Sequence, residues 1–293
     1  MNRKDRLKKN LPFVLIFLVG LLTFAYPLIS QKYYEIESGS ELVEFKKQTE
    51  DIDKEEVKRR MDLARAYNET LDPSRLSDPF TEKEKAGRAE YARMLEVNEM
   101  LGHVEIPRIG QDLPIYAGTT DEVLEKGCGH LEGTSLPIGG DNTHTVITGH
   151  RGLPNAKLFR NLDQLVEGDV FYIHNIEGTL AYQVDKIQVV DPSDFNPIMV
   201  EKGHDYATLL TCTPYMINSH RLLVRGHRIP YQEAIDDGVA NSKRLAPDFM
   251  QLLLILLPVI AILIIIVIKE RRKRTSLSTE VKTIEESIKT YKK

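Results

Sequence analysis

The chain has 293 residues, of which 28% are charged, and its formal net charge at pH 7 is −4. Basic residues gather at the two ends, so removing residues 1–10 (net charge +4) and 269–293 (net charge +5) leaves −13 for the remainder. This acidic body is a poor match for nucleic acid, and we exclude nucleic-acid binding. The two cysteines, Cys128 and Cys212, are too few for a fold stapled by several disulfides.

Two uncharged segments, residues 11–30 and 249–268, are each long enough to cross about 30 Å of hydrocarbon. Basic residues lie outside both segments, in residues 1–10 and in the run KERRKR that opens residues 269–293. The positive-inside rule then predicts two transmembrane helices in a cell membrane, two cytoplasmic tails and an extracellular body over residues 31–248. A cleaved signal peptide is the alternative for the first segment, although AYPLISQKYY has no small-residue cleavage site.

The extracellular body divides into a helical part and a β-rich part. Within residues 31–100, apolar residues three and four apart predict an amphipathic helix over about residues 36–70, and two Asp-Pro steps then mark a break. Over residues 101–232, short β-branched and aromatic runs separated by Gly, Pro, Asn and Asp predict an all-β barrel or sandwich. Residues 233–248 are expected to link this part to the second apolar segment.

The motif TLLTC ends an apolar, strand-like run in Cys212, and Arg221 lies nine residues further on in a second such run. A thiol becomes a good nucleophile when a nearby cation or base lowers its pKa or takes its proton. Acyl transfer also needs a donor for the developing oxyanion. Adjacent strands would bring Cys212 and Arg221 to one end of a sheet. A buried, unreactive Cys212 remains open on these residues alone.

A reactive cysteine also needs a proton-transfer partner, and three histidines compete for that role. His150 closes the strand-like run of HTVITGHRG and opens a loop, whereas His220 and His227 belong to the run that carries Arg221. Composition does not rank them. No Cys/His spacing is typical of a zinc site, so we expect neither a metal nor another cofactor.

The motif TLLTC followed by Arg221, with TGHRG upstream, resembles the sortase family of Gram-positive cell-surface transpeptidases. The segments EIPRIGQDLPIYAGT and GHLEGTSLPIGG extend the resemblance over most of residues 75–232. The segment SDPF, together with two membrane spans, is similar to the class C, pilus-assembling sortases. The resemblance implies an all-β, eight-stranded sortase barrel, preceded by helices and a lid and flanked by two transmembrane helices.

The resemblance implies a catalytic triad of His150, Cys212 and Arg221. In such enzymes the thiolate attacks the carbonyl between Thr and Gly of an LPxTG-like sorting signal and forms a thioacyl intermediate. By this resemblance His150 protonates the leaving amine, and Arg221 hydrogen-bonds the substrate or the oxyanion. A lysine of a pilin subunit then accepts the acyl group, which builds a covalent pilus.

The resemblance also assigns Asp78, Pro79 and Phe80 to a lid near residues 76–82. In class C sortases the aspartate would pair with Arg221, and the phenylalanine would cover the catalytic cysteine. Without the resemblance, SDPF is an ordinary Asp-Pro turn.

Two alternatives stay open, and one cysteine has no assignment. A housekeeping sortase would attach surface proteins to the cell wall through a cell-wall precursor. A non-catalytic, membrane-tethered adhesion or binding module would keep Cys212 inert. Cys128 stands where the resemblance implies a small residue such as alanine, and it receives no role. A disulfide between it and Cys212 would block the enzyme, so that pairing is disfavoured.

Overall fold

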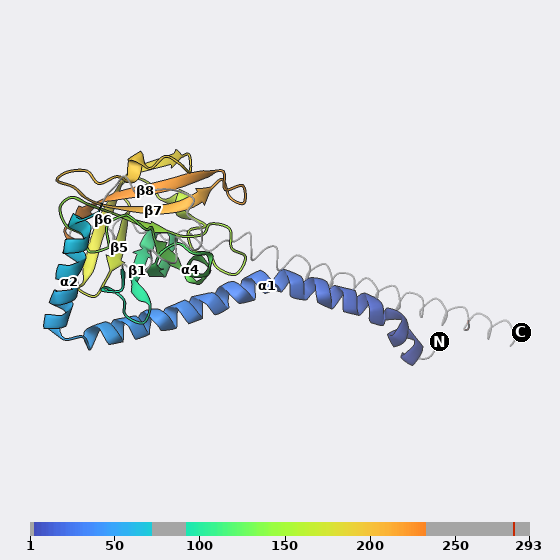
Figure 1. Ribbon diagram of the computed structural model, residues 1–293. Helices are drawn as coiled ribbons and strands as arrows, with labels where there is room; N and C mark the ends of the chain where they lie inside the picture. Colours follow the sequence, from blue (N-terminus) through green and yellow to red (C-terminus); the bar gives the residue numbers. More distant parts are fainter. Residues whose placement is uncertain (1–2, 72–91, 233–283, 285–293) are drawn as a thin grey trace, which may run out of the picture. The chain divides into compact units, whose positions relative to one another are not determined.

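The computed structural model describes residues 3–71, 92–232 and 284 (Figure 1). The chain divides into two compact units, Met1–Arg244 and Leu245–Lys293, and all elements below belong to the first. In chain order the elements are α1 (Arg3–Glu50), α2 (Lys54–Glu69), β1 (Met100–Ile106), η3 (Pro107–Ile109), β2 (Gln111–Ala117), α4 (Asp121–Lys126), β3 (Cys128–His130), β4 (Thr143–Thr148), η4 (Leu162–Gln164), β5 (Val170–His174), β6 (Thr179–Val190), η5 (Asn196–Ile198), β7 (Asp205–Thr213) and β8 (His220–Ile229).

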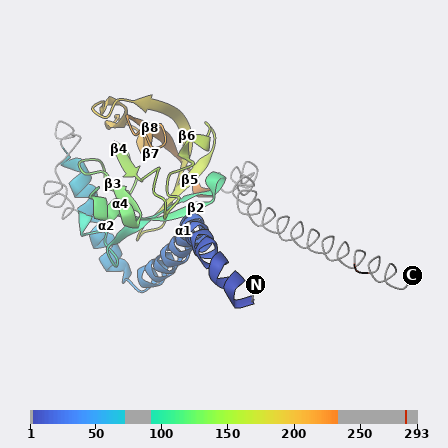
Figure 2. The same cartoon turned by 90° about the vertical axis from the view of Figure 1, so that its right-hand side faces the viewer.

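Eight strands close into a barrel in the order β1-β2-β3-β4-β7-β8-β6-β5 (Figures 1 and 2). Neighbouring strands are antiparallel except for the pairs β2–β3 and β4–β7, which are parallel. Closure leaves no free strand edge and surrounds a core that includes the fully buried Phe159, Phe171 and Tyr182. The predicted eight-stranded barrel is therefore confirmed, and the sandwich that pattern alone allowed is wrong.

Two helices, rather than one, cover the stretch for which a single helix over about residues 36–70 was expected. α1 ends at Glu50, and α2 begins at Lys54. Asp53 caps α2, because its carboxylate accepts a 2.8 Å hydrogen bond from the backbone N–H of Glu55. The boundary between α1 and α2 is marked by this N-cap. The apolar spacing of the residues on either side does not predict it.

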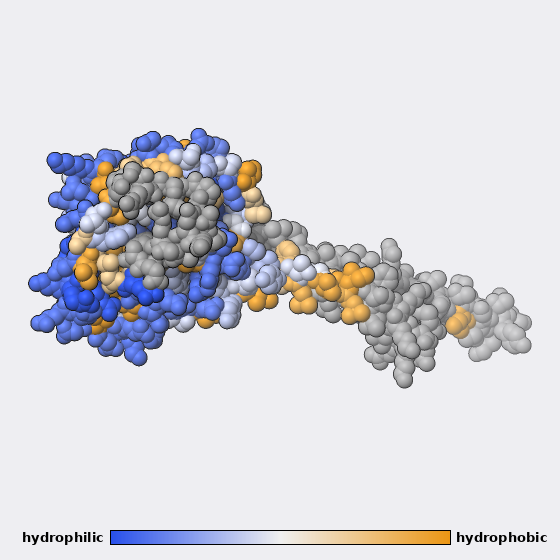
Figure 3. Space-filling view, in the orientation of Figure 1, coloured by the Kyte–Doolittle hydropathy of each residue, from blue (hydrophilic) through white to orange (hydrophobic). Residues whose placement is uncertain are grey.

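The second half of α1 packs on the barrel, whereas its first half exposes apolar side chains. Tyr116 donates a 2.7 Å hydrogen bond to Glu41, and Phe45 is only 3% exposed. Among the described residues, α1 is the one helix long and apolar enough to cross a membrane, from Leu15 onward. Figure 3 shows its exposed apolar side chains beside the largely hydrophilic surface of the barrel. The predicted second span and the linker before it lie outside the described residues.

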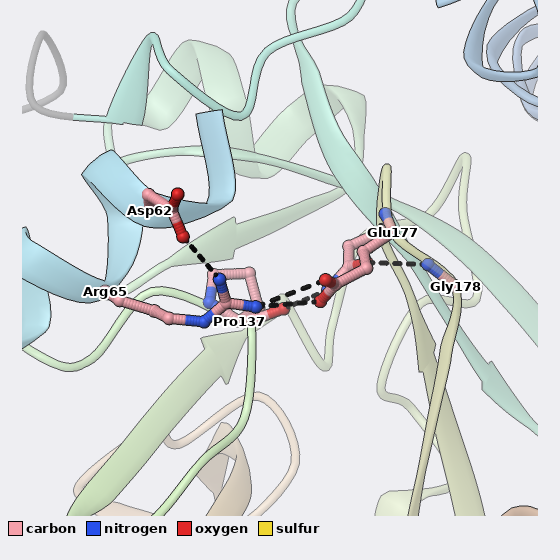
Figure 4. A network of polar contacts seen from close by, with 6 residues as sticks. Asp62, Arg65, Pro137, Glu177 and Gly178 are labelled. Carbon is pink, nitrogen blue, oxygen red and sulfur yellow. Dashed lines mark hydrogen bonds and ion pairs between the residues drawn. The ribbon is translucent and has the colours of Figure 1, made fainter. Parts of the chain in front are cut away.

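α2 is fastened to the barrel by polar contacts on its last two turns. Arg65 lies between Asp62 of its own helix and Glu177 in the β5–β6 turn, at 2.9 Å and 3.2 Å (Figure 4). Asn68 accepts a 2.8 Å hydrogen bond from the backbone N–H of the buried Leu136. Met61 and Ala64, both fully buried, add the apolar side of the contact.

Candidate active site

Cys212 and Arg221 are direct cross-strand partners. TLLTC forms the second half of β7, which runs parallel to β4 on one side and antiparallel to β8 on the other. In the β7–β8 register Cys212 lies opposite Arg221, and Leu210 lies opposite Leu223. Because alternate residues of a strand share a face, these four side chains lie on one face of the β7–β8 pair.

That face forms one wall of a cavity of about 150 Å³. Cys212 and Arg221 line it together with Leu210 and Leu223 of the two strands. The connection between β6 and β7 also contributes to the lining, through Phe195 and other residues. Most of the lining is apolar, and the thiol and the guanidinium are its principal reactive and cationic groups. The site can therefore hold an apolar side chain beside a nucleophile and a hydrogen-bond donor.

His150 lies just past the end of β4, beside the strand that carries Cys212. Thr148 is paired with Leu210 in the parallel β4–β7 register, and the N–H of Gly149 still donates to the carbonyl of Leu210 at 3.1 Å. His150 comes two residues after Thr148, as Cys212 comes two residues after Leu210. The structure therefore pairs Cys212 with Arg221 directly and places His150 just after the strand on the other side of β7.

Gly149 has a packing reason to be glycine. A Cβ atom there would lie 3.0 Å from the ring of Phe159 and 3.3 Å from the sulfur of Cys128. The carbonyl of Gly149 also accepts a 2.7 Å hydrogen bond from the hydroxyl of Thr211. The residue before His150 is therefore tied to the residue before Cys212, and Phe159 and Cys128 leave it no room for a side chain.

The β7–β8 register places the rival histidines His220 and His227 relative to Cys212. His227 pairs with Tyr206, six residues along β8 from Arg221, which corresponds to roughly 20 Å of strand. His220 precedes Arg221 on β8, and its ring lies 3.6 Å from Asp191, which also lines the cavity of Cys212. His220 lies opposite Thr213, one residue from Cys212, whereas His150 follows β4 on the other side of β7.

A family model described as a sortase domain matches residues 104–229. Sortase C-1 of Streptococcus pneumoniae, a solved structure, is 57% identical with a TM-score of 0.63, and the match covers 66% of this chain and 99% of that one. The pilus-related sortase C of Group B Streptococcus is 60% identical with a TM-score of 0.61, over 64% of this chain and 96% of that one. The chain belongs to the sortase family.

A more distant relative matches a larger share of the chain. Sortase A of Bacillus anthracis is 26% identical over 214 residues, which are 73% of this chain and 90% of that protein. The prediction of a sortase-type cysteine transpeptidase is thereby confirmed.

Both cysteines of this sortase are free thiols. Cys128 on β3 is completely buried, and this burial raises the pKa of its thiol far above the ordinary value. Such a thiol stays protonated and inert at neutral pH. Cys212 is partly exposed in the cavity wall. The two cysteines therefore differ in access to solvent and reagents.

The predicted lid residues of this sortase, Asp78, Pro79 and Phe80, lie outside the described residues. Their assignment continues to rest on the sequence motif SDPF.

Sequence reasoning missed two contributions to the site of this sortase. Thr211 is part of the motif TLLTC, but the sequence predicts no role for its hydroxyl. Strand alternation directs this hydroxyl away from the cavity and toward the end of β4, where it donates to Gly149. Phe195 sits in DPSDFNP, a proline-containing segment between two strands that reads as an ordinary loop. Both contributions depend on contacts between separate segments of the chain, and such contacts produce no local sequence pattern.

Proposed function

We propose that this sortase is a membrane-anchored, pilus-assembling transpeptidase. It cleaves an LPxTG-like sorting signal between Thr and Gly and transfers the acyl group to a pilin lysine. The observation that carries the proposal is the pairing of Cys212 with Arg221 at the wall of an apolar cavity. Solved relatives at 57% and 60% identity are a sortase C-1 and a pilus-related sortase C, which favours pilin over cell wall as the acceptor.

In the first half-reaction the Cys212 thiolate attacks the threonyl carbonyl and forms a tetrahedral intermediate. Arg221 donates hydrogen bonds to the oxyanion or to the substrate backbone, where a permanent positive charge is most effective. The C–N bond to glycine then breaks, and His150 gives its proton to the leaving amine. The products are a thioester on Cys212 and a peptide with a free glycine amine.

In the second half-reaction a neutral lysine amine attacks the thioester carbonyl. His150, now neutral, takes the proton that the amine loses as the new amide bond forms. The C–S bond breaks, and the Cys212 thiolate returns. The result is an isopeptide bond between two subunits. The apolar lining of the cavity, which includes Leu131 and Leu223, suits the leucine and proline of the sorting signal.

Regulation by a lid is a further part of this proposal, and it rests on the sequence. Asp78 would pair with Arg221 and Phe80 would cover Cys212, with Pro79 holding the two in an extended spacing. Replacing Asp78 and Phe80 by alanine should therefore speed the alkylation of Cys212 by a small thiol reagent. An unchanged alkylation rate in the double variant would rule out the lid.

The membrane topology also belongs to this proposal. The apolar first half of α1 supports an N-terminal anchor, and residues 249–268 would supply a second span. The basic flanks of both segments favour two cytoplasmic termini, with the barrel outside the cell beside its exported substrates.

The test uses the full chain in detergent micelles with an LPxTG-like peptide and a second peptide that contains an acceptor lysine. The proposal predicts a branched isopeptide product that is absent with Cys212→Ala. The lid variant Asp78→Ala/Phe80→Ala serves as the background in which cleavage is fastest. Transfer to a cell-wall precursor in preference to lysine would favour a housekeeping sortase instead. No cleavage in either background would favour a binding module.

A further inference from the structure

Arg151, which follows His150 directly, is a buried cation that the triad does not use. It is 8% exposed, although arginine is seldom buried unless it is paired. The motif TGHRG therefore contains a second charged residue in addition to its histidine. A buried guanidinium is retained only where its donors and its charge are satisfied.

The guanidinium of Arg151 makes contacts in three directions. One Nη donates a 2.7 Å hydrogen bond to the hydroxyl of Thr213. The other forms an ion pair with Asp163 of η4, and Nε donates to the carbonyl of Arg160 at 3.3 Å. The planar fork of arginine can make these contacts together, and a lysine ammonium cannot reproduce their geometry.

The hydrogen bond from Arg151 to Thr213 joins the residue after His150 to the residue after Cys212. The 2.7 Å bond from Thr211 to Gly149 links the two preceding residues in the same way. His150 and Cys212 are thus bracketed on both sides by cross-links between their own neighbours. The loops beyond them also touch, since a Cβ at Gly152 would lie 3.3 Å from the sulfur of Met216.

We propose that Arg151 is a positioning residue that fixes the spacing between the His150 imidazole and the Cys212 thiol through its hydrogen bond to Thr213. Asp163 and the carbonyl of Arg160 hold the guanidinium in place. This proposal rests on the proposed function, because it assumes that these two residues exchange protons during acyl transfer. Proton transfer and nucleophilic attack are sensitive to displacements of about 1 Å, which can cost about a hundredfold in rate.

The test compares Thr213→Val with Thr213→Ser in the full chain. Valine keeps the shape and suits a strand but removes the acceptor, whereas serine keeps the hydroxyl. We expect Thr213→Val to lower kcat for LPxTG-like peptide cleavage by about 10- to 100-fold, with KM within about twofold. Thr213→Ser should retain most of the turnover. Arg151→Lys should resemble the valine variant if it remains folded.

Alkylation of Cys212 by iodoacetamide at pH 7 gives a readout that needs no substrate. A nearby imidazolium raises the thiolate fraction, so Thr213→Val should slow alkylation, and a merely loosened site would speed it. In a His150→Ala background, Thr213→Val should not change the alkylation rate further. The imidazole whose distance from the thiol it would alter is then absent. Circular dichroism melting confirms that each variant is folded at the assay temperature.

Equal kcat and equal alkylation rates for Thr213→Val and Thr213→Ser would overturn the positioning role. So would an additive effect of Thr213→Val in the His150→Ala background. If neither the wild-type enzyme nor the lid variant cleaves the peptide, the proposed function fails. The alkylation comparison still decides whether Arg151 couples the two residues, so the two failures are distinguishable.

Discussion

At the scale of single residues, the site depends on the small volume of Gly149. The ring of Phe159 and the sulfur of Cys128 occupy the space that a side chain would need, and the following residue is His150. A methyl group there must push against an aromatic ring in a closely packed core. The displacement would be passed directly to the histidine and to its neighbour on β7.

We predict that Gly149→Ala lowers kcat for LPxTG-like peptide cleavage by about tenfold or more and costs about 1–3 kcal/mol of stability. Gly39→Ala on α1 is the matched control, because a Cβ at that position meets nothing within 4 Å. Steady-state kinetics and thermal melting of both variants measure the effects. Wild-type kinetics in Gly149→Ala would show that the packing around this glycine does not position His150.

The two thiols provide a second prediction at this scale. Cys128 is fully buried with a raised pKa, whereas Cys212 is partly exposed, so a disulfide-exchange reagent at pH 8 should label one thiol in the folded enzyme and two in denaturant. Cys212→Ala should remove the labelling of the folded enzyme. If Cys128→Ala removes it instead, the assignment of the accessible thiol is wrong.

At the scale of elements, the contacts that hold α2 to the barrel contribute unequally to the free energy of unfolding. The Arg65–Glu177 ion pair is about half exposed on both sides, and such pairs contribute about 0–1 kcal/mol. Asn68 instead satisfies the backbone N–H of Leu136, which is completely buried. Losing the partner of a buried donor costs more than losing an exposed ion pair.

We therefore predict that Asn68→Ala lowers the free energy of unfolding by about 1–3 kcal/mol, while Arg65→Ala changes it by less than about 1 kcal/mol. Thermal melting followed by circular dichroism ranks the two variants. The opposite order, with the arginine variant less stable, would contradict this account of how α2 is fastened.

The sequence predicts elements better than it predicts contacts between them. Alternating apolar runs bounded by turn residues correctly indicate the β-rich part, because strand periodicity is local. The parallel β4–β7 pairing joins residues far apart in the chain, and no local pattern predicts it. The hydrogen bond from Arg151 to Thr213 has no local signature at all. The break at Asp53 was missed because a single N-cap decides it.

At the scale of the whole molecule, buried histidines make stability depend on pH. Burial lowers the pKa of His130 and of His144 to about 4, so both are neutral in the folded protein at pH 5 to 7. In the unfolded chain each takes up a proton below about pH 6.5. The unfolded state then binds more protons than the folded state, so stability falls as pH decreases from about 6.5 toward 4.

We predict a lower melting temperature at pH 5 than at pH 7, with each histidine contributing up to about 1.4 kcal/mol per pH unit inside that window. His144→Gln should reduce this dependence, whereas His204→Gln, at an exposed position, should leave it unchanged. Calorimetry of the full chain in detergent measures it. A melting temperature that rises toward pH 5 would contradict the burial of these rings as neutral groups.

The central claim is that Cys212 carries the substrate acyl group between the two half-reactions. The most direct measurement is the intact mass of the full chain after acid quenching in the presence of an LPxTG-like peptide, followed by mapping of the modified residue. We predict an added mass equal to the peptide up to and including threonine, located on Cys212 and absent in Cys212→Ala. Cleavage that persists in Cys212→Ala, or an acyl group mapped to another residue, would contradict the account.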